Sequence, residues 1–146
     1  MFKIPIDILI IDDEPDFAEM LALRLKDAGH RVRTAQDGDS GLAALTAGAC
    51  DVVILDIRMP GKDGITVLRA IKNDHPLVEV ILLTGHGTVD TAVDGLKAGA
   101  FDYIQKPARF EELLEKLEDA RDHKAEHEKR VRRAEARALM RQSGDI

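Results

Sequence analysis

The chain has 146 residues, of which 45% are hydrophobic and 33% are charged, a composition typical of one folded domain. Its net charge of −6 argues against nucleic-acid binding by the whole surface. Its single cysteine, Cys50, excludes an intrachain disulfide and a cysteine-based metal site. The longest early apolar stretch is too short to span a membrane and no export cleavage pattern accompanies it, so we expect a cytoplasmic protein.

Apolar runs alternate with helical patterns along the chain. Continuous runs rich in Val, Ile and Leu are typical of strands buried on both faces of a parallel sheet. The predicted strands are 6–11, 30–35, 51–55, 78–83 and 101–105. The predicted helices run from Pro15 to Gly29, over 40–47, 65–71 and 92–96, and over 109–141, where neither Gly nor Pro interrupts the pattern. This alternation predicts βα units and a parallel sheet with helices on both sides.

Acidic residues follow two of the predicted strands directly. Asp12, Asp13 and Glu14 follow the first strand, and Asp56 follows the third. In a parallel α/β sheet, ligands gather beyond the carboxyl ends of the strands, so adjacent strands would bring these carboxylates together. Carboxylates that share one pocket repel, and a hard cation such as Mg²⁺ is the partner that such oxygen ligands favour. Thr84 and Lys106 end the fourth and fifth strands at the same edge.

Four segments together resemble the response-regulator receiver domains of bacterial two-component signalling, the CheY-like superfamily. They are ILIIDDEPDF, VVILDIRMPGKDG, ILLTGHG and KAGAFDYIQKP. The resemblance covers residues 4–121 and implies an α/β fold: a doubly wound five-stranded parallel sheet of flavodoxin-like order 2-1-3-4-5. We therefore expect a receiver domain over residues 1–121 and an extended C-terminal helix over residues 122–146 with a disordered end.

The resemblance implies a role for each residue of the carboxylate edge. Asp56 would accept the phosphoryl group of a phosphohistidine, as a signalling phospho-acceptor that catalyses only its own phosphorylation and dephosphorylation rather than as an enzyme. Asp13, Asp12, Asp56 and the backbone carbonyl of Arg58 would hold Mg²⁺, or Mn²⁺ in its place.

Further roles are implied for the ends of the fourth and fifth strands. Lys106 would pair with Asp56 at rest and with the phosphoryl group afterwards, and a cis Lys106–Pro107 bond would aim it. The Thr84 hydroxyl would bind another phosphoryl oxygen.

A switch follows from the same resemblance. On phosphorylation Thr84 would move inward, and Tyr103, the only tyrosine, would enter the vacated space. The face formed by the fourth helix, fifth strand and fifth helix would then change for partner binding or dimerisation. Gly95, inside the weak fourth helix, fits a mobile element. Arg58 and His86 would flank the phosphoryl group and set its lifetime, unless both simply point to solvent.

The last helix extends beyond what a receiver needs. Residues 109–128 carry four basic and eight acidic side chains, and residues 129–141 carry six basic and one acidic. Its heptad seam is polar in the middle, which leaves a solvated projecting helix or a weak dimer stalk. The basic block over residues 129–141 could touch an acidic partner or nucleic acid, but a solvated face is the more common use of such a run. His123 and His127 are four residues apart and share a helical face, as a pair of metal ligands can. Because no third ligand is fixed nearby, we expect both to be surface histidines.

Two other classes of protein, metal-dependent phosphohydrolases and flavin-binding electron carriers, are built on a similar parallel sheet. A metal-dependent phosphohydrolase needs a second acid two residues after its nucleophile, where this chain has Arg58. A flavin carrier needs a hydroxyl- and glycine-rich loop after the first strand, where acidic residues would repel phosphate. We therefore expect a phospho-accepting module, either stand-alone or N-terminal in a longer regulator. Its partner would be a histidine kinase or histidine phosphotransfer protein, with homodimerisation open and no direct contact with nucleic acid or membrane.

Overall fold

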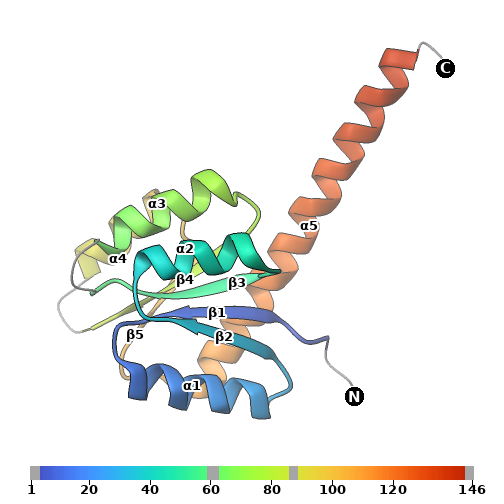
Figure 1. Ribbon diagram of the computed structural model, residues 1–146. Helices are drawn as coiled ribbons and strands as arrows, with labels where there is room; N and C mark the ends of the chain where they lie inside the picture. The colour runs from blue at the N-terminus through green and yellow to red at the C-terminus, as the bar shows by residue number, and fades with distance from the viewer. Residues whose placement is uncertain (1–3, 59–62, 86–88, 144–146) are drawn as a thin grey trace.

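A computed structural model describes residues 4–58, 63–85 and 89–143. Five parallel strands form one sheet in the order β2-β1-β3-β4-β5, as the resemblance implies (Figure 1). The strands are β1 (Asp7–Ile11), β2 (Arg31–Ala35), β3 (Val52–Asp56), β4 (Glu79–Thr84) and β5 (Asp102–Gln105). The helices are α1 (Pro15–Asp27), α2 (Gly38–Ala47), α3 (Gly64–Asp74), α4 (Val89–Lys97) and α5 (Phe110–Ser143).

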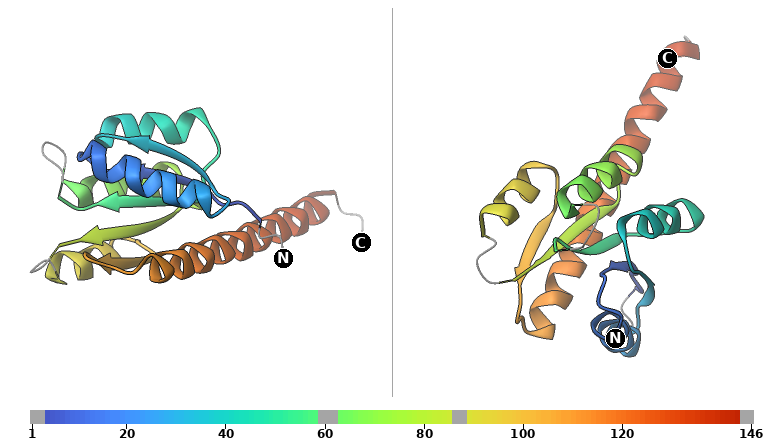
Figure 2. Two further views of the ribbon diagram at one scale, coloured as in Figure 1. Left: turned by 90° about the horizontal axis from the view of Figure 1, so that it is seen from below. Right: turned by 60° about the vertical axis from the view of Figure 1, so that its left-hand side comes forward.

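Two apolar layers sandwich the sheet because neighbouring residues of each buried strand face opposite sides. On one side Ile10 and Ile54 pack with residues of α1 and α5. On the other side Leu9 and Val53 pack with residues of α2 and α3. Figure 2 shows these helices on the two faces of the sheet. The predicted burial on both faces is therefore confirmed for β1, β3 and β4, whereas the edge strands β2 and β5 are only partly buried.

Local chemistry moves several predicted boundaries by one or two residues. Helix α2 begins at Gly38 rather than at Ser40, because Asp37 caps it. The Asp37 side chain accepts a hydrogen bond from the backbone N–H of Ser40 at 2.7 Å, and the Ser40 hydroxyl accepts one from the N–H of Asp37 at 3.3 Å. This reciprocal capping box satisfies backbone donors that the start of a helix otherwise leaves unpaired.

Gly95 brings α4 against the sheet. It is buried, and a Cβ atom at this position would collide with the Cδ1 atom of Leu82 in β4. Gly95 was expected to mark a weak, mobile helix. The structure adds a second reason for a glycine at this position, which is close packing against β4. The absence of a side chain lets the helix approach the strand closely.

Helix α5 is a single helix of 34 residues whose first part is fastened to the sheet. Lys116 forms an ion pair with Asp102 at 2.6 Å, and Lys124 forms one with Asp51 at 3.2 Å. His123, expected as a surface histidine, is exposed, and its Nδ1 atom contacts the buried Glu79 at 2.6 Å. Beyond these contacts the helix projects from the body of the domain (Figure 1).

The projecting part of α5 is strongly polar. Within the described residues no helix combines the length and apolar character that crossing a bilayer requires. The expected disordered end, residues 144–146, lies outside the described residues.

Candidate functional site

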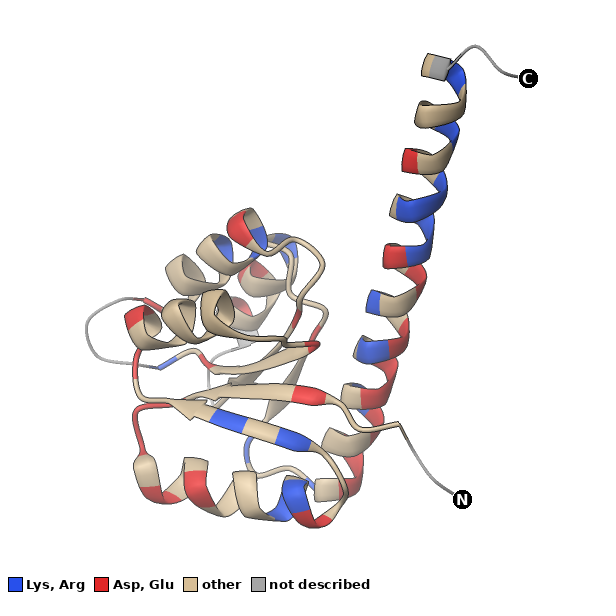
Figure 3. Cartoon of the chain, turned by 45° about the vertical axis from the view of Figure 1, so that its right-hand side comes forward, with Lys and Arg blue, Asp and Glu red and all other residues tan. Residues whose placement is uncertain are grey.

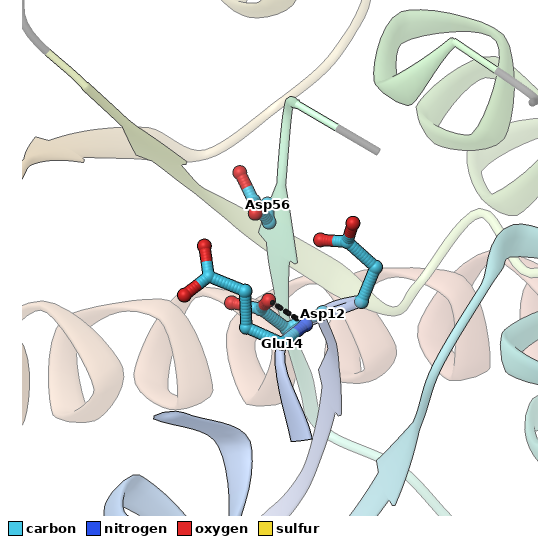
Figure 4. Close-up of side chains that lie close together, drawn as sticks. Asp12, Glu14 and Asp56 are labelled. Atoms are coloured by element: carbon cyan, nitrogen blue, oxygen red, sulfur yellow. Dashed lines mark hydrogen bonds between the residues drawn. The ribbon is translucent and has the colours of Figure 1, made fainter. Parts of the chain in front are cut away.

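The parallel register brings the acidic ends of β1 and β3 together. Ile11 of β1 pairs with Leu55 of β3, so that Asp12 and Asp56 follow at the same edge of the sheet. One carboxylate oxygen each of Asp12, Asp13, Glu14 and Asp56 lies within 4.8 Å of the others. Figure 4 shows the carboxylate of Asp56 at the end of its strand above Asp12 and Glu14. The predicted convergence of these side chains is thus observed.

Asp12 is the most deeply buried member, with 1% of its surface exposed. Its Oδ1 atom accepts a hydrogen bond from the backbone N–H of Glu14 at 2.9 Å. Its Oδ2 atom is buried and has no hydrogen-bond partner among the described residues. Burial raises the pKa of the Asp12 carboxyl, although that N–H bond and the charge of Lys106 act in the opposite direction.

Asp56 is held in a similar way at the end of β3. It is buried, and its Oδ1 atom accepts a hydrogen bond from the backbone N–H of Arg58 at 3.0 Å. Burial raises the pKa of Asp56, the Arg58 N–H and Lys106 lower it, and the neighbouring carboxylates raise it further. The side chain is therefore fixed by its own turn, while the surrounding negative charge is only partly balanced.

Lys106 lies at the same edge but differs from the expected resting arrangement. Its backbone N–H donates to the carbonyl of Thr84 at 2.7 Å, and the bond to Pro107 is cis. Its ammonium lies 3.8 Å from Oδ2 of Asp12 and 4.2 Å from the centre of the Phe17 ring. The expected resting ion pair with Asp56 is replaced by these contacts, because the partnerless oxygen of Asp12 and the aromatic face of Phe17 both attract a cation.

Of the remaining expected residues, Thr84 ends β4 and Tyr103 lies on β5. Thr84 is buried, and its hydroxyl donates to the carbonyl of Ile104 at 3.4 Å. Next to it, a Cβ atom on Gly85 would meet only the guanidinium of Arg58, at 3.9 Å, among the described residues. Tyr103 is partly buried against the apolar layer that contains Leu82. His86 lies outside the described residues.

The donor set fits a hard divalent cation. Carboxylate oxygens are the ligands that Mg²⁺ favours, and one of them, Oδ2 of Asp12, is buried without a hydrogen bond. A cation beside it would supply the missing partner and offset the burial and the carboxylate repulsion that raise the pKa of Asp12 and Asp56.

Two residues of the site were missed as participants. Glu14 was placed at the end of the first strand but was given no role, although its carboxylate belongs to the cluster. Phe17, whose ring centre lies 4.2 Å from the ammonium of Lys106, was given no role at this site. Its position one helical turn after the acidic turn was the available signal.

Comparisons with known proteins agree with this geometry. Residues 8–118 match the family model described as the response regulator receiver domain. The chain is 44% identical over 110 residues to the nitrogen assimilation regulatory protein NtrX of Azorhizobium caulinodans, covering 74% of this chain and 24% of that protein. It is 39% identical over 113 residues to the probable transcriptional regulatory protein TcrX of Mycobacterium tuberculosis, covering 77% and 48%.

A solved structure shares the fold as well as the sequence pattern. The receiver domain of NtrX from Brucella abortus superposes with a TM-score of 0.76 at 42% identity, over 80% of this chain and 98% of that one. The chain therefore spans about a quarter to a half of the length of these curated relatives, and nearly the whole of the isolated domain.

Proposed function

The chain belongs to the response regulator receiver family, and from that premise we propose that Asp56 accepts a phosphoryl group from a phosphohistidine on a partner protein. The observation that supports this most directly is the convergence of four carboxylates within 4.8 Å at the edge where β1 and β3 end. The family sends signals between proteins by phosphoryl transfer, and Asp56 is the member of this cluster that ends β3, where the matching motif has its acceptor.

The reaction needs one nucleophile and one leaving group. A carboxylate oxygen of Asp56 attacks phosphorus, the P–N bond of the phosphohistidine breaks, and the imidazole of the donor departs with the bonding electrons and takes up a proton. The product is an acyl phosphate on Asp56. The hydrogen bond from the Arg58 N–H orients the carboxylate, leaving its second oxygen to attack.

Asp13, Asp12, Asp56 and the backbone carbonyl of Arg58 would hold the divalent cation, Mg²⁺ or Mn²⁺. When bound, the cation would neutralise negative charge on the carboxylates and on the phosphoryl oxygens. Asp12 can serve it because one of its oxygens is already occupied by the Glu14 N–H while the other has no hydrogen bond among the described residues.

Lys106 and Thr84 would receive the phosphoryl oxygens. The ammonium of Lys106 leaves Asp12 and Phe17 and forms a charge-assisted contact with one oxygen. The hydroxyl of Thr84 exchanges the Ile104 carbonyl for another oxygen, a trade that costs little because the existing bond is long, at 3.4 Å.

The exchange at Thr84 couples the site to the face formed by α4, β5 and α5. Movement of Thr84 toward Asp56 opens space beside the end of β4, and Tyr103 on the neighbouring strand enters it. Tyr103 starts partly buried, so it has a short distance to travel. The changed face would bind a partner or a second copy.

Arg58 and His86 set the lifetime of the acyl phosphate in this proposal. The guanidinium of Arg58 lies beside Gly85, the residue that follows β4. His86 follows Gly85 in the sequence but lies outside the described residues.

The wider role is also part of the proposal. The donor is a histidine kinase or a histidine phosphotransfer protein, and the chain works in the cytoplasm. Residues 1–121 act as the receiver unit and residues 122–146 as a helical extension. The unit acts alone or as the N-terminal module of a longer regulator.

Incubation with acetyl phosphate and Mg²⁺, followed by intact-protein mass spectrometry, tests the acceptor. We expect one added phosphoryl group on the parent protein and none on the Asp56→Asn variant. Asp51→Asn, at the opposite end of the same strand, is the matched control and should be labelled like the parent. Equal labelling of the Asp56→Asn variant would refute the proposal.

A further inference from the structure

One exposed face of α5 carries a continuous row of charged residues, which we call the α5 stripe. Successive members are three or four positions apart, the spacing that places residues on one face of a helix. All nine side chains are exposed. The stripe consists of Glu111, Glu115, Asp119, Asp122, Glu126, Lys129, Arg133, Arg137 and Arg141.

The stripe points away from the domain to which α5 belongs. The residues that α5 buries against the sheet are Leu113, Leu117 and Ala120. At about 100° of rotation per residue these lie on the opposite side of the helix from the stripe. The stripe is therefore accessible over its whole length, including the part that is fastened to the domain.

The charges of the stripe are sorted by position. Its first five members are acidic and its last four are basic, with the change of sign between Glu126 and Lys129. Figure 3 shows the same division as a predominantly red first half and a predominantly blue second half of α5. Three members already form ion pairs on the same helix: Asp122 with Arg121 at 3.2 Å, and Lys129 with Glu126 at 3.7 Å.

This order of charges discriminates between two ways of pairing the helix with itself. In a parallel pair, acidic residues face acidic residues and basic residues face basic ones, which is repulsive along the whole length. In an antiparallel pair, each acidic half faces a basic half. Like-charge contacts of the first kind are a strong means of excluding a wrong arrangement.

We propose that the α5 stripe is an interface for a second copy of this chain, with the two helices antiparallel and the two-fold axis near residues 127 and 128. In this register Glu126 faces Lys129 of the second copy, and Asp122 faces Arg133. Farther out, Asp119 faces Arg137 and Glu115 faces Arg141. Two-fold symmetry makes each of these four pairs occur twice.

The arrangement is compatible with the shape of the domain. Each domain lies on the side of its own α5 opposite to the stripe, so the two helices can lie side by side with the domains outside. Nucleic acid is a poorer occupant, because a phosphate backbone attracted by the basic half would be repelled by the acidic half of the same row.

Exposed ion pairs are weak singly and are screened by salt. The association is therefore expected to be weak and strongly dependent on ionic strength. Sedimentation velocity of the unphosphorylated chain 1–146 tests this directly. The association constant for the dimer should fall by at least about tenfold between 0.1 M and 1 M NaCl, as the screening length falls from about 10 Å to about 3 Å.

Adjacent arginines provide a matched pair of variants. Arg133→Glu places a like charge opposite Asp122 twice in the dimer and should weaken association about tenfold or more. Arg132→Glu makes the same chemical change at a neighbouring exposed position off the stripe. It should change the association constant of the dimer by less than about twofold. The combined Asp122→Lys/Arg133→Glu variant should recover association.

Disulfide cross-linking of introduced cysteines tests whether the two α5 helices of the dimer are antiparallel. Asp122→Cys/Arg133→Cys should form an interchain disulfide on mild oxidation, whereas Arg133→Cys alone should not, because antiparallel helices separate its two copies by about 16 Å along the axis. The native Cys50 is buried, and burial raises the pKa of its thiol to about 12, so it should not interfere.

A monomer at both salt concentrations would overturn the proposal. So would equal effects of Arg132→Glu and Arg133→Glu, or efficient cross-linking of Arg133→Cys alone. None of these measurements requires phosphorylation, so their outcome is independent of the function proposed for Asp56.

Discussion

The ammonium of Lys106 lies 3.8 Å from Oδ2 of Asp12, the buried carboxylate oxygen that has no hydrogen bond among the described residues. The lysine therefore partly offsets the charge of Asp12 at rest, at a distance too long for a hydrogen bond. Because Asp12 and Asp56 belong to one cluster, moving Lys106 toward a phosphoryl group would remove this compensation. A cation at the cluster would then be needed more, which links metal binding to phosphorylation.

Replacing Asp12 by Asn should stabilise the metal-free protein. The amide keeps an oxygen for the Glu14 N–H, and it removes a buried charge that faces other carboxylates. We expect a gain on the order of 1 kcal/mol, which corresponds to about 2–4 °C in the thermal midpoint. Addition of Mg²⁺ should raise the midpoint of the parent and leave the variant almost unchanged.

Differential scanning calorimetry with and without Mg²⁺ checks this prediction. Asp102→Asn is the control, because Asp102 is paired with Lys116 at 2.6 Å and its neutralisation should lower stability slightly. A less stable metal-free Asp12→Asn protein would contradict the prediction.

Affinity for Mg²⁺ should decrease as the pH falls. Burial raises the pKa of both Asp12 and Asp56 above the ordinary value, so protons compete with the cation at a higher pH than at exposed carboxylates. Isothermal titration calorimetry between pH 7 and pH 5 should show progressively weaker binding and increasing proton release. Constant affinity across this range would contradict raised pKa values for Asp12 and Asp56.

The raised pKa values of Asp12 and Asp56 also determine how the stability of the metal-free protein changes with pH. A native pKa above the unfolded one means that the native state holds the proton more tightly. This contribution to the free energy of unfolding is fully present below the unfolded pKa and is lost as the pH rises through the raised native pKa of Asp12 and Asp56.

Gly95→Ala should destabilise the protein, although the same change usually stabilises a helix interior. The added methyl group would collide with Leu82, and overpacking of this kind costs about 1–3 kcal/mol. Urea denaturation measures the change. Shortening the neighbour in a Gly95→Ala/Leu82→Val variant should recover part of the loss, and a stabilised single variant would mean that α4 does not pack so closely.

His123→Ala should lower the free energy of unfolding by about 1–3 kcal/mol, because it removes one partner from a buried carboxylate. Glu79 is 5% exposed, and the Lys72 ammonium at 3.1 Å would remain as its ionic partner. His127→Ala, one turn farther along α5, should change stability by less than about 0.5 kcal/mol. Urea denaturation measures the free energy of unfolding of both variants. An equal loss in the two would rule out a structural role for the contact between His123 and Glu79.

Beryllofluoride with Mg²⁺, a mimic of the phosphoryl group, should shift the NMR signals of Thr84 and Tyr103. The Thr84 hydroxyl is expected to leave the carbonyl of Ile104, and the ring of Tyr103 to move to a more buried position. The single tyrosine makes its ring signals unambiguous. Residues at the opposite end of the sheet, such as Ile6 and His30, should remain unshifted; unchanged Thr84 and Tyr103 signals would disprove the switch.

The sheet and its acidic edge were predictable because they depend on local pattern. Runs such as residues 52–55 can be buried only as strands of a covered sheet, and the chemistry follows from what stands at the next position, Asp56. The boundaries were less predictable, since the start of α2 depends on the reciprocal hydrogen bonds of Asp37 and Ser40 rather than on the apolar pattern.

Contacts between distant segments were the part that sequence patterns could not supply. No pattern indicated a partner for His30, which is buried and whose Nδ1 atom accepts a hydrogen bond from the N–H of Ile6. His123 meets Glu79 across 44 positions of sequence. The resting position of Lys106 depends on a side-chain conformation and on Phe17, neither of which leaves a mark in a linear motif.

The ion pairs of Lys116 and Lys124 and the contact of His123 fasten the first part of α5 to the sheet and leave the remainder projecting. At about 1.5 Å per residue, the projecting part beyond Lys124 is about 29 Å long. A small tilt of the attached part relative to the sheet would therefore become a larger displacement at the distant tip, without any change in the helix itself.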